Sequence, residues 1–84
     1  MKKKKLFRKI LSGSANIRFE DLVTVVEAFG FRLSRVSGSH YLFTHPAISE
    51  LLNLQDRKGK AKPYQIRQFL MLIEDHNLSM EEDS

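Results

Sequence analysis

The sequence predicts a small α+β domain whose elements follow the order α-β-β-β-α, preceded by a short N-terminal helix. Two segments carry apolar residues at helical spacing, a strand-like block lies between them, and the turns inside that block are short. A chain of 84 residues holds one such domain. Because it has no cysteine, its stability depends on helix-on-sheet packing alone.

The N-terminal helix is expected just before a turn at residues 12–14. The apolar residues of this segment recur at i, i+1, i+4 and i+5; they are Leu6, Phe7, Ile10 and Leu11. The helix is short and basic, so we expect it either to dock on the domain or to be disordered. A membrane-surface role is the less favoured alternative.

A longer helix is expected from Phe19 to Phe29, where apolar residues form a stripe over about three turns. Glu20 and Asp21 lie in its first turn, where the helix dipole favours negative charge. Gly30 follows the last apolar position and is expected to end the helix.

Three strands are expected next, over residues 31–36, 40–45 and 51–55. Residues 37–39 read Ser-Gly-Ser and form the first turn. Pro46 ends the second strand, because proline has no N–H to donate to a ladder.

Residues 46–50 are expected to form a loop, since Pro46 and Ser49 interrupt the apolar pattern. The spacing of Ile48, Leu51 and Leu52 also fits one helical turn, so this part of the prediction has two versions.

The last helix begins at Pro63, which suits a first helical turn, and Asn77 is the expected stop. From Ser79 the tail is polar and is expected to fray. The chain thus divides into a basic extension (residues 1–17), the domain (18–78) and an acidic tail (79–84).

Strands so close in sequence should pair as an antiparallel meander, with both long helices on one face. The other face is then open to water or a partner. Double-stranded-RNA-binding domains share this order and layout, which is a likeness of fold alone.

Composition and charge exclude several classes. Hydrophobic residues make up 42% and charged residues 29%, which indicates a folded chain. No apolar run approaches the roughly 20 residues that span a bilayer, so we expect neither export nor a membrane segment. The net charge of +4 is concentrated at residues 1–9 and 57–67, and basic segments favour polyanions.

His40 is the candidate for chemistry. Alternation along the second strand puts Tyr41 and Phe43 toward the core and His40 on the open face, with Asn53 and Gln55 beside it. Imidazole exchanges protons near neutral pH, and RNA supplies its own nucleophile in the 2′-hydroxyl. Periodicity alone, however, favours an ordinary surface histidine.

The other two histidines are expected to be structural. His45, before Pro46, suits the end of a strand, and His76 suits contact with the last carbonyls of its helix. We expect no metal site and no cofactor, because the acids are scattered and lack ligand spacing. Gly59 is not expected to belong to a phosphate-binding loop, because the residues around it lack the spacing of a Walker motif.

Two blocks of the sequence resemble the HicA family of toxins. The first runs Gly-Phe-Arg-Leu at residues 30–33 and Val-Ser-Gly-Ser-His-Tyr-Leu-Phe-Thr-His-Pro at 36–46. The second runs Leu-Asn-Leu-Gln at 52–55 and Gly-Lys-Ala-Lys-Pro-Tyr-Gln-Ile-Arg-Gln at 59–68, and resembles one branch of that family. The resemblance covers about residues 19–78, so residues 1–17 are an extension with a role in RNA affinity, packing or partner contact.

The resemblance implies a double-stranded-RNA-binding-domain-like fold and a cytoplasmic ribonuclease that cleaves mRNA and arrests translation. It also implies a HicB-type antitoxin partner. The family's catalytic histidine corresponds to His40, and Gly38 and Ser39 form the turn that presents it. Four residues are candidates for phosphate contacts on charge alone: Arg57, Lys58, Lys60 and Lys62.

Two other hypotheses remain. One is a non-catalytic RNA-binding module that uses the same basic face. The other is an interaction domain whose open sheet meets an acidic protein.

Overall fold

The computed structural model of the protein describes residues 2–13 and 16–80. It has six elements in the order α1 (Lys2–Leu11), α2 (Phe19–Ala28), β1 (Arg32–Ser37), β2 (His40–His45), β3 (Ile48–Gln55) and α3 (Pro63–Asp75). The strands form one antiparallel sheet in the order β1-β2-β3. The predicted α+β fold class and element order are confirmed.

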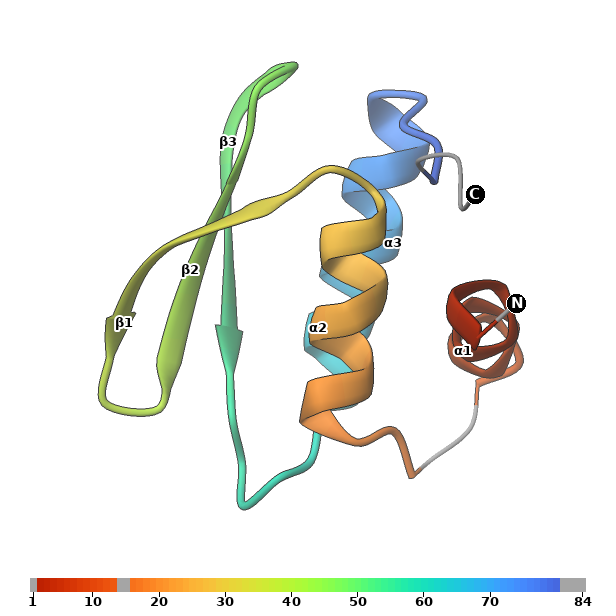
Figure 1. Ribbon diagram of the computed structural model, residues 1–84, viewed down its shortest axis with the longest axis vertical. Helices are drawn as coiled ribbons and strands as arrows, with labels where there is room; N and C mark the ends of the chain where they lie inside the picture. Colours follow the sequence, from red (N-terminus) through yellow and green to blue (C-terminus); the bar gives the residue numbers. More distant parts are fainter. Residues whose placement is uncertain (1, 14–15, 81–84) are drawn as a thin grey trace.

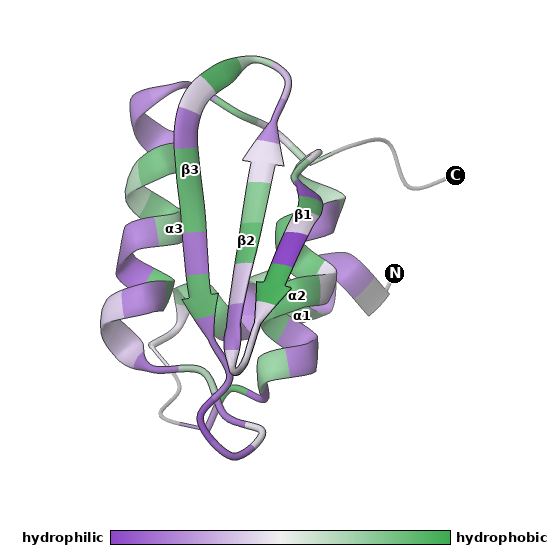
Figure 2. Ribbon diagram, turned by 90° about the vertical axis from the view of Figure 1, so that its left-hand side faces the viewer, coloured by the Kyte–Doolittle hydropathy of each residue, from purple (hydrophilic) through white to green (hydrophobic). Residues whose placement is uncertain are grey.

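The molecule is layered, with the sheet on one side and the helices on the other (Figure 1). Helices α2 and α3 face the sheet, and α1 lies on the far side of these two helices (Figure 1). The opposite face of the sheet is left uncovered by helices, as Figure 2 shows from that side.

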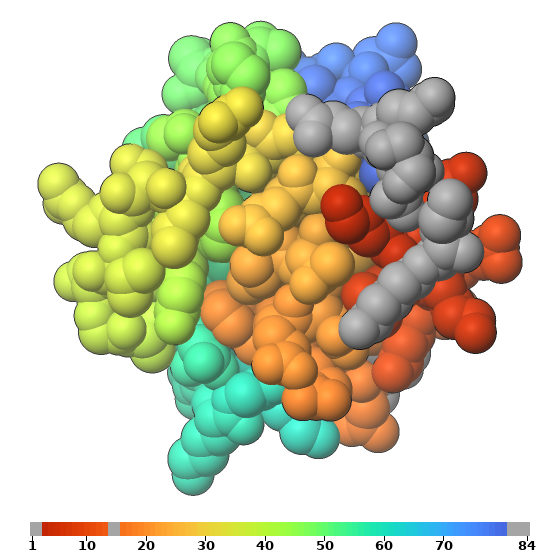
Figure 3. All heavy atoms as spheres, in the orientation of Figure 1, coloured from red at the N-terminus to blue at the C-terminus, as the bar shows by residue number. Residues whose placement is uncertain are grey.

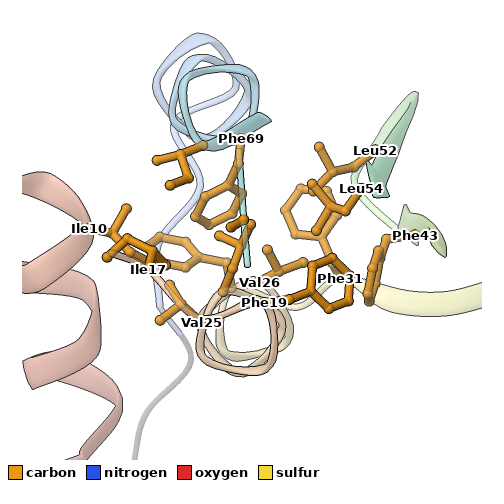
Figure 4. Packing of buried hydrophobic residues seen from close by; sticks show 14 of the residues in the cluster. Ile10, Ile17, Phe19, Val25, Val26, Phe31, Phe43, Leu52, Leu54 and Phe69 are labelled. Carbon is orange, nitrogen blue, oxygen red and sulfur yellow. The ribbon is translucent and has the colours of Figure 1, made fainter. Parts of the chain in front are cut away.

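The core fills the space between the sheet and the helices (Figure 4). Phe43, Leu52 and Leu54 enter it from the strands and Phe69 enters it from α3, and all four are fully buried. Alternation along β2 and β3 predicts this correctly: Leu52 and Leu54 are two apart in β3, and Phe43 is the buried residue of β2.

Helix α1 is docked, which decides between the two expected states. Its Ile10 is 3% exposed, and the ring of Phe7 lies 5.0 Å from that of Phe29. Ile17, before α2, is also buried in the same core. Helix α1 and Ile17 therefore pack with the rest of the chain, while the status of residues 1–17 as an extension stays a prediction.

The helix ends follow the sequence signals. Gly30 has a φ of +95°, so it adopts the left-handed conformation expected after α2. Pro63 begins α3, and Asn77, with a φ of +53°, follows its C-terminal end. Asparagine tolerates this region better than other residues with side chains.

The third strand is longer than predicted, and the predicted loop at residues 46–50 is wrong. Pro46 and Ala47 form a two-residue turn, and Ile48 pairs with His45 across it. Proline at the first turn position needs no ladder hydrogen bond, so Pro46 ends β2 without preventing β3 from starting. The alternative helical turn is also excluded.

Strand β1 begins at Arg32 rather than Phe31 and contains a register shift between Leu33 and Arg35. Phe31 is instead buried beneath the sheet, 2% exposed. Because of the shift, Ser34 is an extra residue and the side-chain alternation of the strand restarts at Arg35.

Fraying is predicted from Ser79 onward, and the structure describes residues 79 and 80 of this tail. Leu78 and Met80 are partly buried against the core, so this part of the tail is packed. Residues 81–84 lie outside the described part of the chain. Within that part, no helix has the length and apolar character that crossing a membrane requires.

Candidate functional site

A tight turn places His40 at the start of β2. Gly38 and Ser39 are its two central residues, and Gly38 has a φ of +60°. Ser39 does not share this positive φ, so the turn is of the II′ type, which matches the twist of a hairpin. The backbone N–H of Asp56 donates to the Ser39 carbonyl at 2.8 Å, which holds the turn against the end of β3.

The predicted faces of β2 are confirmed. Phe43 is fully buried, and Tyr41 packs its ring 5.0 Å from that of Phe19 on the helix side. His40 is exposed on the other side of the sheet. Its cross-strand neighbours are Ser37 on β1 and Gln55 on β3.

Asn53 holds the imidazole of His40. The Nδ1 atom of His40 lies 3.4 Å from the amide oxygen Oδ1 of Asn53. An amide oxygen only accepts, so this contact favours the tautomer with the proton on Nδ1. The lone pair of Nε2 is then available, which is the form a general base requires.

The side chain of Ser39 is positioned by a second amide. The Nε2 atom of Gln55 donates to Ser39 Oγ at 3.3 Å. The serine hydroxyl keeps its own proton for a further acceptor, such as a phosphate oxygen beside His40. The predicted grouping of His40, Asn53 and Gln55 on one surface is therefore confirmed, and Ser39 contacts Gln55 beside it.

The four basic candidates after β3 do not form one cluster around His40. Arg57 and Lys60 pair across a tight turn whose central residues, Lys58 and Gly59, both have positive φ (55° and 83°). The N–H of Gly59 donates to Asp56 Oδ1 at 2.7 Å and stabilises this turn. Arg57 and Lys58 are thus exposed at the tip of a small hairpin that continues from β3.

Lys60 and Lys62 lead toward the helix layer. The Nζ atom of Lys60 donates to Asn16 Oδ1 at 3.4 Å, and its backbone forms a bridge with Arg18. Lys62 is the N-cap residue of α3 and is half-buried. Of the four candidates, Arg57 and Lys58 are therefore the better placed for a ligand on the open face.

Sequence reasoning missed two arginines on the open face. Arg35 pairs with Leu42, and Arg32 pairs with Thr44, so both share the side of the sheet that carries His40. Arg35 is the diagonal neighbour of His40 across β1 and β2. The signal was present in the spacing of Leu33 and Val36, which is three rather than two and indicates a bulge.

His45 is structural, as predicted. Its Nε2 lies 2.9 Å from the Phe29 carbonyl oxygen, to which it must donate, and its Nδ1 accepts from the Ala47 N–H at 3.0 Å. The neutral ring satisfies both contacts at once. The ring also packs against Phe31 in a T-shaped arrangement at 4.9 Å.

His76 differs from its predicted role. Its ring does not contact the last carbonyls of α3; its Nε2 lies 2.9 Å from Glu50 Oε1 on β3. It therefore joins the end of the helix to the sheet, because β3 extends far enough toward its N-terminal end to present Glu50.

No group of three or more histidine or acidic side chains that could hold a metal ion occurs within residues 2–13 and 16–80. A largely apolar groove lies between α1 and α3, with Phe7, Leu11, Leu70 and Met71 among its lining residues. This groove contains none of the predicted site residues. The surface around His40 is open, which suits an extended ligand better than a small enclosed one.

Comparisons with protein-family models, with curated proteins and with solved structures each found no match to this chain.

Proposed function

We propose that this chain is a metal-independent endoribonuclease that cleaves mRNA in the cytoplasm and arrests translation, as the toxin of a type II toxin–antitoxin pair. His40 is the catalytic residue. The observation that carries the proposal is the contact between His40 Nδ1 and Asn53 Oδ1, which leaves Nε2 of an exposed imidazole free. The sequence resemblance to the HicA toxins supports the same assignment.

The reaction uses the 2′-hydroxyl of the substrate. Nε2 of His40 takes the proton of this hydroxyl, and the 2′-oxygen attacks the adjacent phosphorus. The bond from phosphorus to the 5′-oxygen breaks, and that oxygen takes a proton from water. The hydroxide that remains takes the proton from His40 and restores the neutral ring. The products are a 2′,3′-cyclic phosphate end and a 5′-hydroxyl end, so no oxidant or cofactor is consumed.

Positive charge near the phosphate stabilises the transition state. Arg35 lies diagonally across from His40 on the same face, and Ser39 holds a hydroxyl beside it. Arg57 and Lys58 extend the cationic surface past the end of β3 and suit backbone contacts farther along the RNA. We therefore give Arg35 a closer role than Lys60 or Lys62.

A HicB-type antitoxin is the proposed partner, and it neutralises the toxin by binding it and masking the open face. This part of the proposal rests on the sequence resemblance. The exposure of His40 is compatible with it, because a protein covering the sheet would block access to the ring.

The decisive experiment is cleavage of a long mRNA in excess EDTA by purified wild type and by His40→Ala. Wild type should cut, and the variant should lose about 10²–10⁴-fold in rate while still binding RNA. Because His40 is exposed, the free energy of unfolding of the variant should lie within about 0.5 kcal/mol of the wild-type value. New ends should carry 5′-hydroxyls, which a polynucleotide kinase labels directly.

His76→Ala is the matched control. It removes an imidazole that lies at the end of α3 and contacts Glu50, so cleavage should be unchanged. Asn53→Ala should lower the rate without changing the cut positions, since it frees the ring that Asn53 holds. Cleavage that persists in His40→Ala would refute the proposal.

A non-catalytic RNA-binding module is the second candidate. It is favoured by the placement of the other two histidines, since His45 is held by Phe29 and Ala47 and His76 contacts Glu50. Of the three histidines, His40 alone is then left to transfer protons, whereas a non-catalytic module needs no such group. RNA binding by wild type without cleavage would support the module.

A further inference from the structure

Strand β1 is an exposed edge of the sheet. All six of its residues are exposed, and within the described part of the chain its outer side pairs with no other strand. Figure 1 shows β1 diverging from α2 as it runs toward the Gly38 turn. In Figure 3 the strand, drawn in yellow, projects at the margin of the molecule. Its outward N–H and C=O groups are thus accessible for hydrogen bonds.

The helix-facing side of β1 is apolar and uncovered. Leu33 pairs with Phe43 and Val36 pairs with Tyr41, so both lie on the side where the core begins. Leu33 is nevertheless 45% exposed and Val36 is 48% exposed. A fourth strand beside β1 would place its own apolar side chains against these two residues and extend the core.

The opposite side of β1 is cationic. Arg32 and Arg35 lie on the open face of the sheet, and neither has an ion pair with any residue of the described ranges. A second copy of this chain is a poor occupant, because antiparallel pairing of two β1 strands would bring arginines close to arginines. Acidic side chains would instead complement both positions.

We propose that the outer edge of β1 is a docking site for an acidic, extended segment of a partner protein, which pairs with β1 as a fourth strand. Backbone hydrogen bonds hold such a strand, and its alternate side chains give specificity. The segment has apolar residues on the side of Leu33 and Val36, and aspartate or glutamate on the side of Arg32 and Arg35. The proposal stands independently of the ribonuclease activity.

The probe is a blocked eight-residue peptide of alternating glutamate and valine, titrated into the full 15N-labelled chain. Amide shifts should concentrate on β1, and its outward amides should exchange more slowly with solvent when the peptide is bound. A peptide with lysine in place of glutamate should not bind. An acidic peptide with proline at two central positions should bind at least about tenfold more weakly, because it cannot form a strand.

Arg35→Glu should lower the affinity of the chain for the acidic peptide by about tenfold or more. Lys58→Glu is the matched control, since Lys58 is also an exposed cation but lies on the hairpin after β3, and its effect should stay below about twofold. Arg32→Glu serves as a second variant, and far-UV circular dichroism checks the fold of each protein.

Three outcomes would overturn the proposal. The first is acidic-peptide binding that proline does not weaken, which indicates attraction between charges alone. The second is a single-stranded RNA of equal charge that shifts β1 while the peptide does not. The third is a dimer of this chain joined through β1, detected by sedimentation and abolished by Arg35→Glu or Val36→Asp.

Discussion

Two histidines five residues apart in β2 should respond in opposite ways to replacement by alanine. His40 is exposed and its loss is expected to affect function. His45 forms hydrogen bonds through both ring nitrogens, to the Phe29 carbonyl and the Ala47 N–H. Its loss is therefore expected to lower stability. Its ring joins the β2–β3 turn to the C-terminal end of α2.

The expected cost of His45→Ala follows from these contacts. Each hydrogen bond contributes about 1 kcal/mol, and the edge contact with Phe31 contributes about 0.5–1.5 kcal/mol. Ala47 is exposed, so water can reach its N–H when the ring is absent. This recovers part of the loss, and we expect the free energy of unfolding to fall by about 2 kcal/mol.

Urea unfolding at 25 °C, followed by far-UV circular dichroism, measures the effect. For so small a chain the denaturant slope should be about 1 kcal/mol per M, so the midpoint should fall by about 2 M. The slope itself should stay unchanged, because the surface exposed on unfolding is nearly the same.

Two partial replacements test the individual bonds. His45→Asn places an amide oxygen near the position of Nδ1 and should retain the Ala47 bond, whereas His45→Gln places an amide N–H near Nε2 and should retain the Phe29 bond. Each should recover roughly half of the lost stability. If the free energy of unfolding of His45→Ala lies within about 0.5 kcal/mol of the wild-type value, the structural role assigned to His45 is wrong.

Two further predictions concern the turn and α1. Gly38→Ala should lower stability by about 1–2 kcal/mol, because φ is +60° there while an added Cβ meets no atom within 4 Å, so the cost is backbone strain alone. Gly38→Asn should lose less, and equal urea midpoints for glycine and alanine would contradict the turn assignment. Ile10→Ala should cost about 2–4 kcal/mol because Ile10 is buried where α1 docks, while Leu11→Ala, at a site 56% exposed, should cost less than about 0.5 kcal/mol. Equal effects of the two would show that α1 is not docked.

Most of the secondary structure could be predicted from local signals. The stripe from Phe19 to Phe29 and the stops at Gly30 and Asn77 depend only on neighbours in the chain, so they are found where expected. The start of β3 could not be predicted this way. Pro46 breaks a strand but also suits a two-residue turn, and only pairing of His45 with Ile48 decides between these roles.

The face of the sheet that carries the candidate site could also be predicted from local alternation, but not all of its residues could. Strict alternation along β2 and β3 puts His40, Asn53 and Gln55 on one face, and the structure has them there. Arg35 was missed because the bulge at Ser34 restarts the alternation in β1. The positions of the basic side chains after β3 could not be predicted, because charge along a sequence does not show where side chains lie in space.

The sequence by itself determined which residues of β2 and β3 face the core, because the period of a strand acts over a few residues. Tertiary structure alone decided how the elements meet. It brought Glu50 to His76 and Phe29 to His45, and it docked α1. Each of these contacts joins segments far apart in the chain, so its stabilising energy exists only once the fold has formed.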